Sequence, residues 1–188
     1  MPSHTTTRYT LTAMALHWLL ALGLSVLLVF GWYMVGLPFS PTKLKYYNWH
    51  KWAGMTILAL SALRLLWRIT HRPPALPARI TSLMPRWQQV AHHGVHHLMY
   101  VLFFAVPLLG WAYSSAAGFP VVWFGVWQLP DLVAASPELA ETIKPWHMIA
   151  AYTLAVLIVL HVAAALKHQL VDRDGLLQRM LPGRDGSR

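Results

Sequence analysis

Long apolar stretches alternate with shorter polar segments along the whole chain. Four such stretches run approximately over residues 11–33, 49–67, 91–113 and 146–166. A bilayer core about 30 Å thick needs roughly 20 largely apolar residues per helix, and each stretch is long enough. The pattern therefore predicts an all-α integral membrane protein, with a single four-helix transmembrane bundle as the one domain over residues 1–188.

The segments between and beyond these stretches have distinct characters. No A-x-A-like cleavage site follows the first stretch, which is longer than a signal-peptide core, so we expect a retained helix. The outer connection, residues 114–145, contains GFPVVWFGVWQLPDL, which is too short and too broken to span; it would lie along the interface or cap the bundle. Pro107 with Gly110 predicts a kink in the third helix. The polar tail, residues 167–188, ends in GRDGSR, which we expect to fray.

Charge is scarce and unevenly distributed. Charged residues make up 11% of the chain, against roughly 25% in soluble domains, and the formal net charge is +9. With four spans, both termini and the middle connection share one side, and the positive-inside rule makes that side cytoplasmic. That side carries Arg8, Arg64, Arg68, Arg72, Arg79, Arg86, Lys167, Arg173, Arg179, Arg184 and Arg188, whereas the outer side has only Lys43, Lys45, Lys51 and Lys144. No basic groove interleaved with aromatic residues is present, which argues against nucleic-acid binding.

Histidines recur at matching depths in the predicted helices, although polar residues at membrane depth are rare and usually functional. His147 and His161 are fourteen residues apart, so they lie within about 40° of one helix face and about 21 Å apart along the axis. His17 has the depth of His161, and His50 has the depth of His147. Two pairs across the bundle follow, His17 with His161 at the inner end and His50 with His147 at the outer end.

Facing imidazoles across a cofactor-sized gap suit the two axial positions of a haem iron. The chain has no cysteine, which excludes c-type attachment, thiolate-ligated haem and cysteine-bound iron–sulfur clusters, so a b-type haem remains. Any one histidine taken alone could instead bond a hydroxyl or backbone carbonyl of a neighbouring helix. His50, beside Lys51, could be merely interfacial.

The chain resembles the bacterial cytochrome b561 family, four-helix dihaem cytochromes of the inner membrane. The matching segments are ALHWLL, NWHKWAG, LRLLWR, HLMYVLFFAVPLLG, KPWH, LHVAAALKH and LLQRMLP, which cover nearly the whole chain. The resemblance implies two haem b groups, with His17 and His161 holding the cytoplasmic-side haem and His50 and His147 the outer one. Gly54, one turn beyond His50, would leave room for the macrocycle or for close helix packing.

The resemblance extends to family members that act as superoxide oxidases, which pass electrons from superoxide to ubiquinone. It implies a quinone partner in the membrane lipid and superoxide or a redox protein as the donor. Lys43, Lys45 and Lys51 could attract a small anion to the outer haem, or could be snorkelling lysines. His168 is the candidate for proton transfer to the quinone; the alternative is an exposed histidine favoured by the helix dipole.

Two further groups stand near the predicted cytoplasmic end. Arg64, fourteen residues after His50, could pair with an inner haem propionate or snorkel toward anionic headgroups. The cluster AHHGVHH contains His96, which could line the inner haem or quinone pocket and is a rival to His161 as a ligand. The i, i+4 pairs of this cluster could also chelate a metal, although no acidic or cysteine residue is nearby; these pairs are His92 with His96 and His93 with His97.

A different class of function is compatible with the same features. The chain could be a haem-binding membrane anchor or electron-transfer subunit that serves a partner dehydrogenase or hydrogenase. A haem-free transporter or metal permease is disfavoured, because four short spans show no inverted repeat or broken helix pair.

Overall fold

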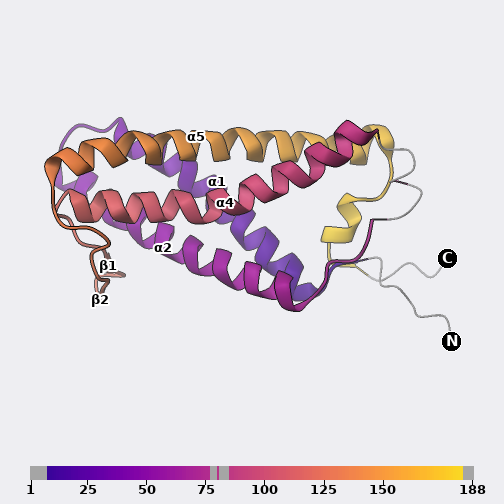
Figure 1. Cartoon of the computed structure of the whole chain (residues 1–188), viewed down its shortest axis with the longest axis horizontal. Coiled ribbons are helices and arrows are strands. Elements are labelled where there is room, and N and C mark those ends of the chain that lie inside the picture. Colours follow the sequence, from indigo (N-terminus) through magenta and orange to yellow (C-terminus); the bar gives the residue numbers. More distant parts are fainter. Residues whose placement is uncertain (1–7, 77–79, 81–84, 184–188) are drawn as a thin grey trace.

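The computed structural model describes residues 8–76, 80 and 85–183, and long helices dominate it (Figure 1). The helices are α1 (Leu11–Val35), α2 (Pro41–Thr70), α4 (Arg86–Ala116) and α5 (Pro137–Lys167). Each is long and apolar enough to cross a membrane. The predicted all-α four-helix membrane bundle is confirmed.

The helices pack in a ring that is closed tightly on three sides. α1 packs against α2, α2 against α4, and α4 against α5, whereas α1 and α5 touch at few points. The core is apolar and includes Leu20, Ile57, Phe103 and Leu154, all of them buried. This apolar waist separates two ends of the bundle, and the polar side chains of the interior lie at those ends.

Two helices begin well before the apolar pattern predicts. α2 begins at Pro41, eight residues before position 49, and α5 begins at Pro137, nine before position 146. Ser40 and Ser136 cap them, each accepting a first-turn backbone N–H at 3.2 Å. A proline at the first helical position has the right φ and needs no hydrogen-bond acceptor. These polar turns form helix because of their caps, which hydropathy does not register.

The outer connection folds into a small antiparallel hairpin, β1 (Val122–Trp123) and β2 (Trp127–Gln128). The indole of Trp52 donates to the Val122 carbonyl at 2.5 Å, and the indole of Trp123 donates back to the Trp52 carbonyl at 3.3 Å. The hairpin therefore caps the outer end of α2, which was one of the two expected placements.

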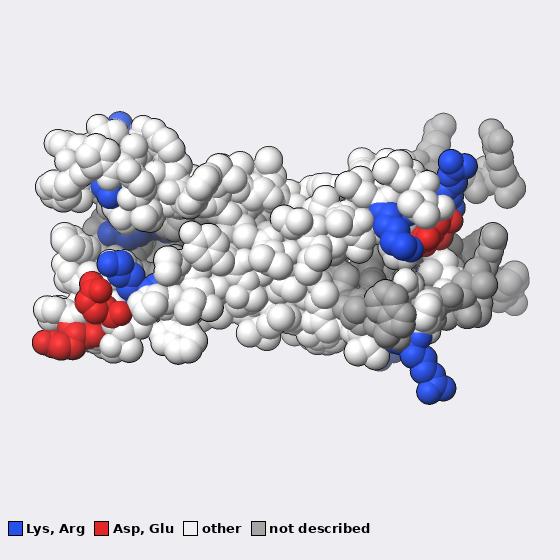
Figure 2. Space-filling model, turned by 90° about the horizontal axis from the view of Figure 1, so that it is seen from above, with Lys and Arg blue, Asp and Glu red and all other residues white. Residues whose placement is uncertain are grey.

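Both described ends of the chain and residues 71–76, which follow α2, lie at the same end of the bundle (Figure 1). Figure 2 shows charged side chains gathered at the two ends, with a long uncharged surface between them. This is the arrangement that four membrane spans require; the cytoplasmic location of the termini stays a prediction. The helix α4 continues through Pro107 and bends along its length (Figure 1); a kink caused by Pro107 and Gly110 stays a prediction.

The described part of the C-terminal tail, residues 168–183, contains two short helical segments. α5 passes into a π-helical turn, His168–Asp172, and a 3-10 helix, Leu177–Met180, folds back onto the inner end. Arg179, which is buried, donates to the Pro74 carbonyl at 2.9 Å. The indole of Trp18 donates to the carbonyl at the end of the 3-10 helix at 2.7 Å. The predicted frayed end lies beyond residue 183, outside the described residues.

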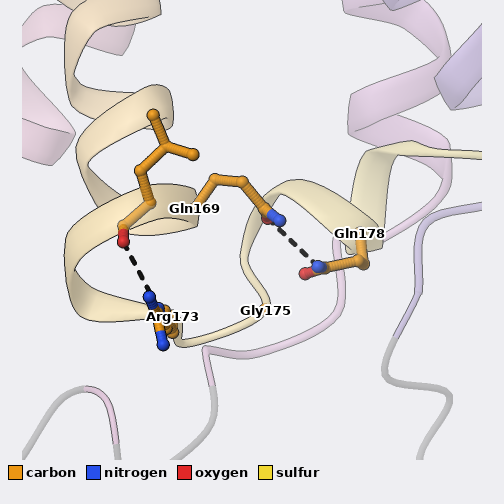
Figure 3. A pocket seen from close by; sticks show the side chains of 5 residues that line it. Gln169, Arg173, Gly175 and Gln178 are labelled. Atoms are coloured by element: carbon orange, nitrogen blue, oxygen red, sulfur yellow. Dashed lines mark hydrogen bonds between the residues drawn. The ribbon is translucent and has the colours of Figure 1, made fainter.

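A sharp turn lets the tail fold back. Arg173 and Gly175 both have left-handed backbone conformations, with φ of 51° and 81°. The turn leaves an open hollow at the inner end, and the side-chain amide of Gln178 donates to Gln169 across it at 3.0 Å (Figure 3). The polar groups of this hollow are thus largely bonded to one another.

The apolar waist supports a direct test. Leu154 is 0% exposed, so Leu154→Ala should lower the free energy of unfolding by about 3 kcal/mol through lost packing. Leu160→Ala on the same helix removes the same atoms from a side chain that is 54% exposed. This variant should change the free energy of unfolding by less than about 0.5 kcal/mol. Unfolding in detergent followed by circular dichroism checks both. Equal losses would show that the waist is not the core of the bundle.

Candidate functional site

The inner end brings one polar side chain from each helix together. The ring centroids of His17 (α1) and His161 (α5) are 6.2 Å apart, with the rings inclined at 68°. His96 (α4) stands edge-on to His161 at 5.2 Å. Arg64 (α2) is within electrostatic range of His17 and His161. The predicted inner pair and its rival His96 therefore share one site.

Arg64 is held at this site with unused hydrogen-bonding capacity. Its Nε donates to the Tyr100 hydroxyl at 3.1 Å. Its Nη1 is buried and has no hydrogen-bond partner among the residues that the structure describes. A buried guanidinium N–H without an acceptor is costly, so this position suits an anionic oxygen from a bound group.

The outer end holds the second predicted pair. The ring centroids of His50 (α2) and His147 (α5) are 6.3 Å apart, and the rings are inclined at 87°. Nδ1 of His147 lies 2.9 Å from the Val106 carbonyl, which leaves Nε2 as the nitrogen that can bind a metal. Nδ1 of His50 is buried without a partner in the described part of the chain.

Glycines make room for both outer imidazoles. A Cβ at Gly31 of α1 would lie 3.0 Å from Cε1 of His50, and a Cβ at Gly110 of α4 would lie 3.0 Å from Cε1 of His147. Each ring therefore packs against bare helix backbone. Gly54, by contrast, has no heavy atom within 4 Å of its Cβ position, so space is open one turn from His50; its use by a macrocycle stays a prediction.

The spacing of both pairs suits two axial imidazoles on one iron. Metal–nitrogen bonds of about 2 Å on each side, plus roughly 1 Å from nitrogen to ring centre, place the centroids about 6 Å apart. The inner and outer pairs, at 6.2 and 6.3 Å, meet this requirement. The ring centroids of His96 and His161 are 5.2 Å apart, which is shorter than the separation expected for two ligands of one iron.

Comparison with known proteins identifies the family. Residues 8–183 match the family described as prokaryotic cytochrome b561. The chain belongs to this family. It is 32% identical over 187 residues to cytochrome b561 homolog 2 of Escherichia coli K12, covering 95% of this chain and 94% of that protein. It is also 32% identical over 185 residues to the probable superoxide oxidase CybB of Yersinia pestis, covering 95% of this chain and 98% of that protein.

A further relative, cytochrome b561 homolog 1 of E. coli K12, is 30% identical over 181 residues, which are 94% of this chain and 98% of that protein. The protein is therefore a membrane cytochrome b561 and an electron carrier, and the family implies haem b. The two histidine pairs, the buried nitrogens without partners and the open space at Gly54 fit such a group.

The sequence analysis missed the two glycines against the outer rings. Gly31 lies fourteen residues after His17 (17 + 14), and Gly110 lies fourteen after His96 (96 + 14). This is the spacing already noted between His147 and His161. The signal was available, because fourteen residues return to nearly the same helix face at the opposite end of the bundle.

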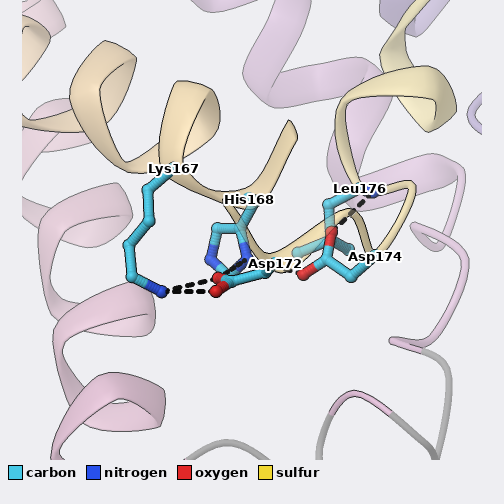
Figure 4. A network of polar contacts seen from close by, with 5 residues as sticks. All are labelled: Lys167, His168, Asp172, Asp174 and Leu176. Atoms are coloured by element: carbon cyan, nitrogen blue, oxygen red, sulfur yellow. Dashed lines mark hydrogen bonds and ion pairs between the residues drawn. The ribbon is translucent and has the colours of Figure 1, made fainter. Parts of the chain in front are cut away.

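His168 lies where α5 ends, in a cluster of polar contacts (Figure 4). Its Nδ1 is 2.6 Å from a carboxylate oxygen of Asp174 and 3.1 Å from one of Asp172. Lys167 donates to the same Asp172 at 2.6 Å. The imidazole is oriented by carboxylates and is only partly exposed, which differs from a solvated helix-end histidine; its role in proton transfer stays a prediction.

The outer lysines also have defined partners. Lys43 donates to the Val35 and Leu37 carbonyls, at 3.1 and 2.6 Å, and so caps the end of α1. Lys51 donates to the carbonyls of Phe119 and Pro120, at 3.4 and 3.3 Å, and ties the outer connection to α2. These lysines therefore fasten the outer loops to the helices.

The histidine cluster AHHGVHH is described only in part. His97 is exposed. The side chains of His92 and His93 lie outside the described residues, and so do the metal-chelating pairs that the sequence suggests.

The glycine contacts predict a selective effect on cofactor binding. Gly110→Ala places a methyl group 3.0 Å from a ring carbon of His147, which its bond to Val106 holds in place, so the imidazole must move. We expect a lower haem-to-protein ratio, measured by pyridine haemochrome. Gly94→Ala is the control, because no atom lies within 4 Å of its Cβ position. Unchanged haem content in Gly110→Ala would count against ligation by His147.

Proposed function

We propose that the protein is a dihaem b-type cytochrome that carries electrons from superoxide to ubiquinone. In this proposal His17 and His161 hold the inner haem, and His50 and His147 hold the outer one. The observation that carries it is the presence of two imidazole pairs at ligand spacing, 6.2 and 6.3 Å, at opposite ends of one bundle. Haem b, when bound, supplies reversible one-electron chemistry that these side chains lack.

The surrounding residues have separate tasks. The Val106 carbonyl fixes the orientation of the His147 ring and leaves Nε2 as the nitrogen that can bind a metal. Arg64, with its unpartnered buried nitrogen, is placed to pair with a haem propionate. Gly54 leaves space beside His50 for the macrocycle. His96 lines the inner site beside His161, where it is the rival ligand.

Superoxide as donor is supported by the relative from Yersinia pestis, which is named a probable superoxide oxidase. The cations Lys43, Lys45 and Lys51 surround the outer end and would raise the local concentration of a small anion. In this proposal the outer end faces the periplasm, and both termini lie on the cytoplasmic side of the bacterial inner membrane. Ubiquinone would arrive through the bilayer.

Reduction of a quinone consumes protons, so a titratable group is needed where it binds. His168 is the residue we propose for this transfer, because its imidazole is already bonded to a carboxylate of Asp174 at 2.6 Å. A histidine–carboxylate pair can pass a proton on while keeping the ring oriented. Its position at the inner end of α5 gives access to water.

The names of the other relatives are equally compatible with a second function. Both E. coli proteins are named only as cytochrome b561 homologues, without a substrate. The chain would then be an electron-transfer subunit for a partner dehydrogenase or hydrogenase. Activity of the isolated chain separates the two functions.

Ligand assignment is tested by removing one imidazole at a time. His161→Ala should lose the inner haem and keep the outer one, which leaves about one haem per chain by pyridine haemochrome. His97→Ala, an exposed histidine on α4, is the control and should keep both. Retention of both haems in His161→Ala, with loss in His96→Ala, would make His96 the inner ligand.

The donor is tested with the purified chain alone. With a soluble ubiquinone analogue, it should consume superoxide faster than spontaneous dismutation, and the rate should fall as salt screens the outer lysines. Lys45→Gln should lower the rate without changing haem content, since Lys45 contacts the Trp49 ring and caps no carbonyl in the described structure. No acceleration over dismutation would favour the partner-subunit function.

A further inference from the structure

A cavity rich in arginine opens at the inner end of the bundle, between α1, α2, α4 and the C-terminal 3-10 helix. Its volume is about 100 Å³. Its lining includes the arginines Arg8, Arg64, Arg68 and Arg72 and the aromatic residues Tyr9, Trp67 and Tyr100. We call it the arginine cavity. No carboxylate is among its described lining residues.

Positive charge in this cavity is concentrated around one aromatic ring. The guanidinium carbons of Arg64 and Arg68 lie 6.0 and 5.4 Å from the centroid of the Tyr100 ring. Within residues 8–76, 80 and 85–183, no acidic side chain pairs with Arg64, Arg68 or Arg72. Two guanidinium groups brought together without a counter-charge repel one another, so the arrangement is stabilised by an anion.

The chemistry of the lining selects among anions. A guanidinium presents a planar fork of N–H donors that matches phosphate and carboxylate oxygens. The hydroxyl of Tyr100 accepts from Arg64 at 3.1 Å, so its own hydrogen can be donated to a ligand. Several donors converge on a space large enough for one tetrahedral oxyanion.

The position of the cavity indicates where the anion comes from. Arg64, Arg68 and Arg72 are spaced four residues apart, and they follow one another along the end of α2 at headgroup level. The indole of Trp67 bonds Thr10 at this level, as interfacial tryptophans do. Apolar side chains of α2, Leu63 and Leu66, are 54% and 60% exposed on the adjoining surface and can contact acyl chains.

We propose that the arginine cavity binds the phosphate of an anionic phospholipid head group from the inner leaflet. Arg68 and Arg72 hold the phosphate, and Tyr100 donates to it at the base of the cavity. Basic pockets between transmembrane helices on the cytoplasmic side are suited to such head groups. The proposal does not depend on which histidines hold haem, or on the electron donor.

Direct binding tests it with the delipidated full chain in neutral detergent. Short-chain phosphatidylglycerol, titrated and counted by native mass spectrometry, should occupy one tight site, and phosphatidylcholine should bind at least about tenfold more weakly. The double variant Arg68→Gln/Arg72→Gln should weaken phosphatidylglycerol binding by about tenfold or more. The control Arg86→Gln/Arg173→Gln removes the same charge from the same end, outside the cavity, and should bind as the parent does.

Three outcomes would overturn the proposal. Equal weakening in the two double variants would show a general charge effect. Inorganic phosphate that binds as tightly as the lipid would assign the cavity to a soluble anion. An altered haem spectrum in Arg68→Gln/Arg72→Gln with unchanged lipid binding would make a haem carboxylate the occupant. If the double variant does not fold, Arg72→Gln alone gives the same test, because Arg72 is exposed beyond the end of α2.

Discussion

An imidazole inside an apolar bundle needs a partner that hydrocarbon cannot supply, and this requirement organises the molecule. His17, His50, His147 and His161 meet in pairs at two levels, and the leucine-rich waist between the levels contains no member of either pair. Nδ1 of His50 at the outer level and Nη1 of Arg64 at the inner level are buried without a hydrogen-bond partner in the described structure. A bound group at each level would satisfy both nitrogens.

The same fourteen-residue spacing places one residue of each helix at the inner level and one at the outer level. Each of the four helices carries two site residues fourteen positions apart, which places them about 21 Å from each other and near one face. The pairs are His17 with Gly31, His50 with Arg64, His96 with Gly110, and His147 with His161. Because neighbouring helices run in opposite directions, the inner residue comes first in α1 and α4, and the outer residue comes first in α2 and α5. The two levels therefore have the same construction, with different side chains.

The sequence could predict the spans and the histidine pairs because both depend on simple periodicity. Apolar runs define bilayer crossings, and depth along each run matches His17 with His161. The helix starts at Pro41 and Pro137 could not be found by hydropathy, since their stability comes from serine caps on polar turns. Nor could the fold-back of the tail, which depends on Arg179 reaching carbonyls more than a hundred residues away in the chain.

Glycine contacts were harder to foresee, since a missing side chain leaves no chemical signal. Gly31 and Gly110 matter only because a ring from another helix occupies the space beside them. Gly54 was singled out through the family resemblance, one turn after His50, and the space beside its Cβ position is open. Gly31 and Gly110 contact histidine rings and Gly54 does not, and this difference depends on how helices distant in sequence pack together.

The two levels differ most in charge, and this difference bears on the direction of electron flow. Arg64 lies within electrostatic range of the inner pair, and the guanidinium groups of Arg64 and Arg68 both lie near the Tyr100 ring. At the outer level, His50 and His147 pack against glycine backbone, and Lys43 and Lys51 direct their charge to loop carbonyls. Positive charge near a redox centre stabilises its reduced form, and so raises its potential. If each level holds a haem, as proposed, the arginines favour an electron on the inner one, which agrees with transfer from an outer donor.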